Sequence, residues 1–145
     1  MIERPDVKRI FFLTDTHIGI RNQDGTVEYI YCHWDGYPEH NGVILTEHYD
    51  TLDKVKELIA LGDLSFLGPE IGEKHDFDGE LNATWCRAYG RDRNDPNTEA
   101  KTISFNDLLE NEGLNVSYVY VFDGDYWECF DTSNSSKIIN LYSKA

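Results

Sequence analysis

The sequence predicts an α+β domain. A mainly antiparallel sheet, built from two β-hairpins and a central strand, carries two to three helices on one face. Two observations support this. Asp24-Gly25 and Asp123-Gly124 each stand between runs of β-forming residues, as in hairpin turns. Between the hairpins, apolar residues recur at helical spacing over 52–59. The 145 residues, 40% of them hydrophobic, suit a single domain over 1–145.

The first hairpin begins the chain. Residues 8–14 form an apolar run typical of a buried strand, and 26–31 form the return strand after the Asp24-Gly25 turn. In the return strand, Val27, Tyr29 and Tyr31 share one face. Residues 10–14 belong either to this hairpin or to an appendage, so 1–17 are treated as an N-terminal extension or an extra strand.

The middle of the chain contains the helices. Residues 43–49 form one helical stretch, and Asp50 or Thr51 caps a second helix that Gly62 ends. Ser104 caps a short helix over 105–111. We expect a loop at 63–79, the central strand at 83–89 and a charged loop at 90–97. The second hairpin consists of strands at 116–122 and 126–130, and a tail segment follows at 138–142.

Charge limits the choice of partner. The formal net charge is −14, which disfavours duplex nucleic acid and favours basic partners. Between Lys101 and Lys137 there is no Lys or Arg, but there are many acidic residues. This 102–136 block is either a solvated acidic face or a surface for a basic protein, or it mimics nucleic acid.

The sequence indicates a cytoplasmic protein. No apolar run reaches the length of a membrane span, and the first residues do not resemble a signal peptide. Cys32, Cys86 and Cys129 are an odd number without a C-x-x-C pair, so no disulfide framework is implied. The sequence predicts neither a bound cofactor nor an oligomeric state.

Two polar groups are candidates for binding a ligand. The first is the aromatic and polar loop that follows the first hairpin, with Trp34, Asp35, Tyr37, His40 and Asn41. The second is a set of arginines in an otherwise acidic chain: Arg87, Arg91 and Arg93. Forked arginines beside aromatic rings suit a nucleotide-type ligand. Alternatively, the loop is a structural corner, and the arginines pair with Asp35, Asp92 or Asp95 to hold loops.

Residues 11–19, Phe-Phe-Leu-Thr-Asp-Thr-His-Ile-Gly, resemble the opening motif of calcineurin-like metallophosphoesterases. Leu61-Gly62-Asp63 resembles their second motif. This resemblance implies a metal-dependent phosphoesterase or nuclease that binds Mn²⁺ through Asp15, His17 and Asp63. The family also needs a G-N-H-[DE] motif, but no Asn-His pair occurs here. Phosphoesterase activity is therefore the alternative hypothesis.

Residues 18–131 resemble a family of small uncharacterised phage and prophage proteins. The segments that match include Tyr-Cys-His-Trp-Asp-Gly-Tyr-Pro at 31–38, Leu-Gly-Asp-Leu-Ser at 61–65 and Tyr-Gly-Arg-Asp-Arg at 89–93. Residues 1–17 depart from the family pattern. The resemblance implies a phage accessory protein in the cytoplasm of an infected bacterium and supplies no catalytic residue.

The favoured hypothesis is a non-enzymatic phage-type protein. It would bind a host protein or a nucleotide-type ligand and counter host defence. The sequence carries no G-x-S-x-G or phosphate-binding P-loop. Cys32 and His33 are neighbours on a strand, so they point to opposite faces and cannot act as a dyad.

Overall fold

β1 (Leu13–Arg21) and β2 (Thr26–Trp34) form the hairpin at the centre of the sheet. The computed structural model describes residues 13–80, 83–134 and 137–142. Of the expected first strand, 8–12 lie outside these residues. Residues 13–17 belong to β1, which continues through them because Thr16 and His17 pair with both β2 and β6.

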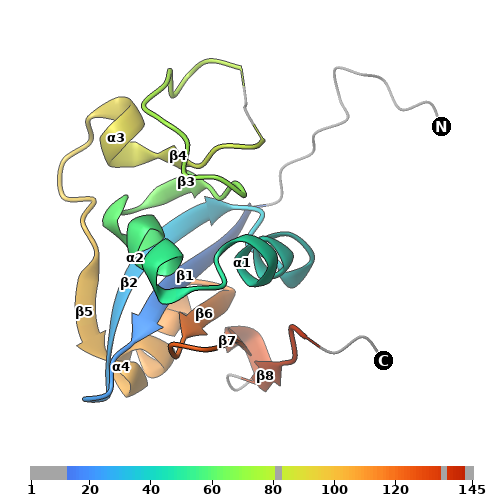
Figure 1. Cartoon of the computed structure of the whole chain (residues 1–145). Helices are drawn as coiled ribbons and strands as arrows, with labels where there is room; N and C mark the ends of the chain where they lie inside the picture. Colours follow the sequence, from blue (N-terminus) through green and yellow to red (C-terminus); the bar gives the residue numbers. More distant parts are fainter. Residues whose placement is uncertain (1–12, 81–82, 135–136, 143–145) are drawn as a thin grey trace.

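The sheet is mixed and mostly antiparallel, in the order β4-β3-β2-β1-β6-β7-β8 (Figure 1). Its other strands are β3 (Leu64–Phe66), β4 (Arg87–Ala88), β5 (Lys101–Ser104), β6 (Tyr118–Phe122), β7 (Trp127–Asp131) and β8 (Lys137–Ile139). The outer edge of β2 is shared, since β5 pairs with its first half and β3 with Cys32 in its second half. The pairs β1–β6 and β2–β3 are parallel and the other pairs antiparallel. The predicted α+β class with a mainly antiparallel sheet is confirmed.

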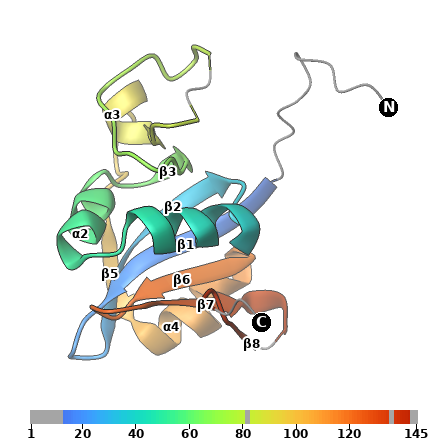
Figure 2. The same ribbon diagram turned by 45° about the vertical axis from the view of Figure 1, so that its right-hand side comes forward.

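Helices lie on both faces of this sheet. α1 (Val43–His48) and α2 (Leu52–Ala60) cover one face (Figure 1). On this face, Ile18 and Ile30 pack in the cluster that contains Val55 and Leu58. α4 (Phe105–Glu110) covers part of the other face, as Figure 2 shows, and its Leu108 is fully buried. The two helices expected on one face are therefore present, and the helix at 105–111 lies on the opposite face, here called the α4 face. The remaining helical segments are the π-helical turn Pro38–Gly42, α3 (Tyr89–Arg93) and two 3₁₀ turns, Glu112–Asn115 and Thr132–Asn134.

The predicted helix caps are confirmed. The Thr51 side chain accepts a hydrogen bond from the Lys54 amide at 3.3 Å, and that of Ser104 accepts one from the Asp107 amide at 3.1 Å. Gly62 follows α2 with φ +79°, and a Cβ there would lie 2.3 Å from the Thr98 carbonyl oxygen. A glycine is required at this position both by the backbone angle and by the close approach.

The segment between the hairpins differs from the prediction. The strand expected at 83–89 is reduced to the two residues of β4, at the edge of the sheet and not at its centre. The expected loop 63–79 contains β3, and the charged loop 90–97 begins inside α3. β5 was not predicted. β3, β4 and β5 are short, and each exists because a neighbouring strand supplies hydrogen-bonding partners.

Candidate functional site

The loop after β2 is held tightly to the sheet. The Gly36 amide donates to the Thr14 carbonyl at 3.1 Å, and the buried Tyr120 hydroxyl donates to the Gly36 carbonyl at 2.6 Å. Asp35 is 2% exposed and has φ +56°. Asn41 is fully buried, and its amide nitrogen lies 3.6 Å from Cys32 Sγ. These contacts are those of a structural corner.

The three aromatic rings of this loop are half-buried. His40 Nδ1 lies 2.8 Å from Asn41 Oδ1, and its ring packs against Phe66 with centroids 5.1 Å apart. Trp34 contacts the His33 ring edge-on at 4.7 Å, and Tyr37 lies 6.2 Å from His40. The rings therefore pack mainly within the corner itself.

The three arginines tie together loops of the chain. Arg91 donates to the carbonyl oxygens of Ile71 and Cys86, both at 2.8 Å, and to the buried carboxylate of Asp92. That carboxylate also accepts from the Ala88 amide, and the Arg91 guanidinium helps to hold its pKa below the usual range although burial opposes this. Arg91 is thus a structural cation.

Arg87 and Arg93 also have partners within the protein. Arg87 donates to the carbonyl oxygens of Gly79 and Glu80. Arg93 forms a forked pair with Asp95, the shortest contact being 2.7 Å, and lies over the Phe77 ring at 4.4 Å. β3 separates these arginines from the loop after β2. The sequence left open that these arginines pair with nearby aspartates to hold loops. Arg91 and Arg93 do so, since they pair with Asp92 and Asp95.

The residues of the metallophosphoesterase resemblance do not form one group. In the part of the chain that the structure describes, no three His, Cys, Asp or Glu side chains converge to hold a metal. Asp63 follows the end of α2, and its carboxylate accepts from the Tyr31 amide at 3.0 Å. Asp15 and His17 both belong to β1. His17 pairs with Tyr31 of β2 and with Val119 of β6, whereas Asp15 lies at the irregularity in the β1–β2 pairing between Leu13 and Thr16.

His17 is a buried neutral side chain on the α4 face. It is 6% exposed, its ring meets Tyr29 edge-on at 4.8 Å, and its Nδ1 has no hydrogen-bond partner among the described residues. Burial, helped by Lys101 and opposed by Asp15, lowers the pKa of His17 to about 4. A buried, neutral imidazole of this kind is part of the core.

The α4 face also carries a group of three polar side chains that the sequence did not predict. Tyr31 and His33 project from β2 towards Asp15 on β1, and we call these three residues the polar cluster. The Tyr31 hydroxyl donates to Asp15 Oδ1 at 2.7 Å and lies 2.5 Å from His33 Nδ1. His33 Nδ1 lies 3.2 Å from Asp15 Oδ1, and both side chains are 30% exposed. The two-residue alternation of β2 could have indicated that Tyr31 and His33 share a face.

A third group lies where the turn between β6 and β7 meets the segment that follows β8. Tyr126 is 63% exposed and Tyr142 43%, and their rings are almost perpendicular, with centroids 5.7 Å apart. Burial raises the pKa of Tyr142, and the carboxylates of Asp123 and Asp50 raise it further. We call Asp50, Asp123, Asp125, Tyr126 and Tyr142 the aromatic–acidic corner. The sequence interpretation noted the acidic residues of 102–136 but not the tyrosine pair.

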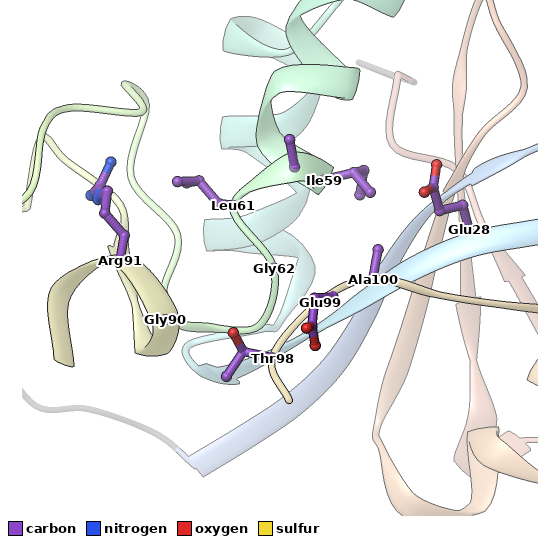
Figure 3. A pocket seen from close by; sticks show the side chains of 10 residues that line it. Glu28, Ile59, Leu61, Gly62, Gly90, Arg91, Thr98, Glu99 and Ala100 are labelled. Atoms are coloured by element: carbon purple, nitrogen blue, oxygen red, sulfur yellow. The ribbon is translucent and has the colours of Figure 1, made fainter. Parts of the chain in front are cut away.

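A surface hollow of about 480 Å³ lies where α2, α3 and β5 meet. Glu28 and Arg91 stand at its opposite ends, with Gly62 and Ala100 between them (Figure 3). The Arg91 guanidinium is already bonded to carbonyl oxygens and to Asp92. Thr98 and Glu99 are the other polar residues of the lining, and the rest are apolar residues and glycines.

Comparison with family models, with curated proteins and with solved structures finds no match to this chain. Among the described residues, no helix is both long enough and apolar enough to span a membrane. The candidate sites are therefore judged on their geometry.

Proposed function

We propose that this protein is a binding protein whose partner is a basic protein of the host cell, and that the aromatic–acidic corner receives a Lys or Arg side chain of that partner. The observation that carries the proposal is the exposed, perpendicular pair of Tyr126 and Tyr142 beside aspartates. Aromatic faces attract cations through their quadrupole, and nearby carboxylates add to the attraction. The resemblance to small phage proteins supports a role against host defence in the cytoplasm of an infected bacterium.

The backbone holds the corner in place. Asp123 Oδ1 accepts from the amides of Asp125 and Tyr126, both at 2.8 Å, which fixes the turn between β6 and β7. The Tyr142 hydroxyl accepts from the Trp127 amide at 2.8 Å, so this ring is anchored to the first residue of β7. Because the rings are positioned before a partner arrives, less conformational entropy is lost on binding.

Charge supports a basic partner. The net charge of −14 steers cationic surfaces towards the protein, and Asp123 and Asp125 lie in the stretch without Lys or Arg. Lys54 pairs with Asp50 at 3.6 Å and offsets part of the local charge, so Asp123 and Asp125 carry the attraction. A nucleotide-type ligand has less support, since Arg91 and Arg93, which would bind its phosphates, are paired within the protein.

The test is capture of proteins from a lysate of the bacterial host by the wild type and by Tyr126→Ala. We expect a basic protein to be retained by the wild type at equimolar amount and lost by the variant. Asp125→Asn should weaken capture and make it less sensitive to salt. Glu110→Gln is the matched control, because it removes an exposed carboxylate on α4, on the far face of the sheet. Equal capture by Tyr126→Ala and the wild type would refute the proposal.

A further inference from the structure

The polar cluster places three donor atoms from three side chains at the corners of a small triangle. Its sides are 2.7 Å from the Tyr31 hydroxyl to Asp15 Oδ1, 2.5 Å from that hydroxyl to His33 Nδ1, and 3.2 Å from His33 Nδ1 to Asp15 Oδ1. All three residues belong to the neighbouring strands β1 and β2, with Asp15 at the irregularity in their pairing between Leu13 and Thr16. The triangle is therefore built from strand residues and not from a loop.

These dimensions match one face of an octahedral metal centre. Three ligands at right angles, each about 2.1 Å from an ion, lie about 3.0 Å from one another. The three measured distances lie on both sides of that value. The Tyr31 hydroxyl contacts both other groups, and Asp15 Oδ1 and His33 Nδ1 also approach each other. All three possible ligand atoms therefore lie within reach of one ion.

We propose that Asp15 Oδ1, the Tyr31 phenolate oxygen and His33 Nδ1 bind a first-row transition metal ion, best ferric iron, on one face of its coordination sphere. Carboxylate and phenolate oxygens are hard ligands, and imidazole suits iron as well as zinc. The ligand set carries two negative charges when an ion is bound, which fits a trivalent cation. This site is independent of the aromatic–acidic corner and of the partner proposed for it.

Binding requires the loss of one proton. The Tyr31 O–H bond breaks as the Fe–O bond forms, and the proton leaves to water; His33 binds through the lone pair of Nδ1 with its proton on Nε2. Without an ion, the Tyr31 hydroxyl donates its proton to Asp15 Oδ1. A strongly polarising ion displaces a proton from a bound oxygen more readily, which favours Fe³⁺ over Mn²⁺.

The surroundings leave room for further ligands. The side chains of Asp15 and His33 are each 30% exposed, so water can complete the coordination sphere. The arrangement resembles catalytic metal sites, in which three protein ligands leave positions open.

The test is titration of the chelator-treated full chain with ferric nitrilotriacetate, followed by visible absorption. Phenolate bound to Fe³⁺ gives a charge-transfer band in the visible range that neither free ferric ion nor a carboxylate site produces. We expect one equivalent of iron to give this band in the wild type. Tyr31→Phe, which removes only the hydroxyl, should abolish it and should lower iron affinity at least tenfold.

Two controls make the result decisive. Tyr118→Phe makes the same change at a half-buried tyrosine on β6 and should keep the full band. Circular dichroism should show that both variants are folded. His33→Gln should reduce affinity and shift the band. Absence of a band in the wild type, or a band that survives in Tyr31→Phe, would overturn the proposal and leave the polar cluster as a hydrogen-bonded link between β1 and β2.

Discussion

The α4 face has two halves that differ in what covers them. One half is covered by α4 (Figure 2). In this covered half, Val27, Val119 and Val121 pack in the cluster that contains Leu108 of α4. In the other half, β1 and β2 carry the polar cluster Asp15, Tyr31 and His33, of which Asp15 and His33 are 30% exposed. Both halves follow the same two-residue alternation. The comparison shows that one face of the sheet carries both a packed core, where α4 covers it, and a partly exposed candidate site.

His17 lies between the two halves and shows the effect of burial. It shares its face with Asp15, but it is 6% exposed and lacks a partner for Nδ1 within the described residues. Its pKa is lowered to about 4, chiefly by burial. His33, on the neighbouring strand, has Tyr31 and Asp15 as partners. The two histidines thus differ in burial and in partners, which makes His17 a core residue and His33 a candidate ligand.

The largest effect is expected in the covered half. Leu108→Ala should lower the free energy of unfolding by about 3 kcal/mol, because it leaves a cavity beside residues that are themselves buried. Urea denaturation measures the change. Leu109→Ala, at a half-buried position on the same helix, is the matched control and should cost less. Equal costs at both positions would mean that α4 does not define the covered half.

The next effect is a pH dependence that comes from His17. Below about pH 6.5 the unfolded chain binds a proton at this imidazole that the folded protein does not bind until about pH 4. Stability should therefore fall as pH drops through this window, by at most about 1.4 kcal/mol per pH unit, with no such loss above it. His17→Phe should remove about 2 kcal/mol of the stability difference between pH 7 and pH 4.5.

Denaturation at the two pH values measures this effect. His48→Asn is the control, because His48 is exposed on α1, and it should keep the wild-type dependence. If His17→Phe keeps the full dependence, the burial of His17 is not the source of the pH dependence.

A smaller effect is expected in the polar cluster. Tyr31→Phe removes a hydroxyl that bonds to Asp15 at a half-buried position, so it should cost about 1 kcal/mol in the absence of metal. Thermal unfolding of the chelator-treated protein measures this cost. Added Fe³⁺ should stabilise the wild type more than the variant, because an ion that binds only the folded state raises its stability. A cost as large as that of Leu108→Ala would show that the polar cluster belongs to the core.

The smallest effect on stability is expected in the aromatic–acidic corner. Tyr126→Ala removes a side chain that is 63% exposed, so the midpoint of urea unfolding should stay close to that of the wild type. Loss of partner capture without loss of stability would separate binding from folding at this position. A large drop in the midpoint would instead make Tyr126 a structural residue and remove its support for the proposed function.

Local signals in the sequence determined the two hairpins, α2 and α4. The Asp-Gly turns, the caps at Thr51 and Ser104 and the glycine after α2 depend on interactions between residues close in the chain. The interpretation of Gly62 as a helix end was confirmed, because its positive φ of +79° follows directly after α2.

Only the tertiary structure decided how these elements combine. The parallel pairing of β1 with β6 joins residues about a hundred positions apart, and β3 and β5 exist only as partners of β2. The sequence drew attention to the arginines because the chain is otherwise acidic. It could not indicate their carbonyl partners, because a partner such as Ile71 for Arg91 comes from a distant loop. Likewise, the approach of Asp15 to Tyr31 and His33 depends on the pairing of β1 with β2 and on its irregularity between Leu13 and Thr16, which composition and spacing do not encode.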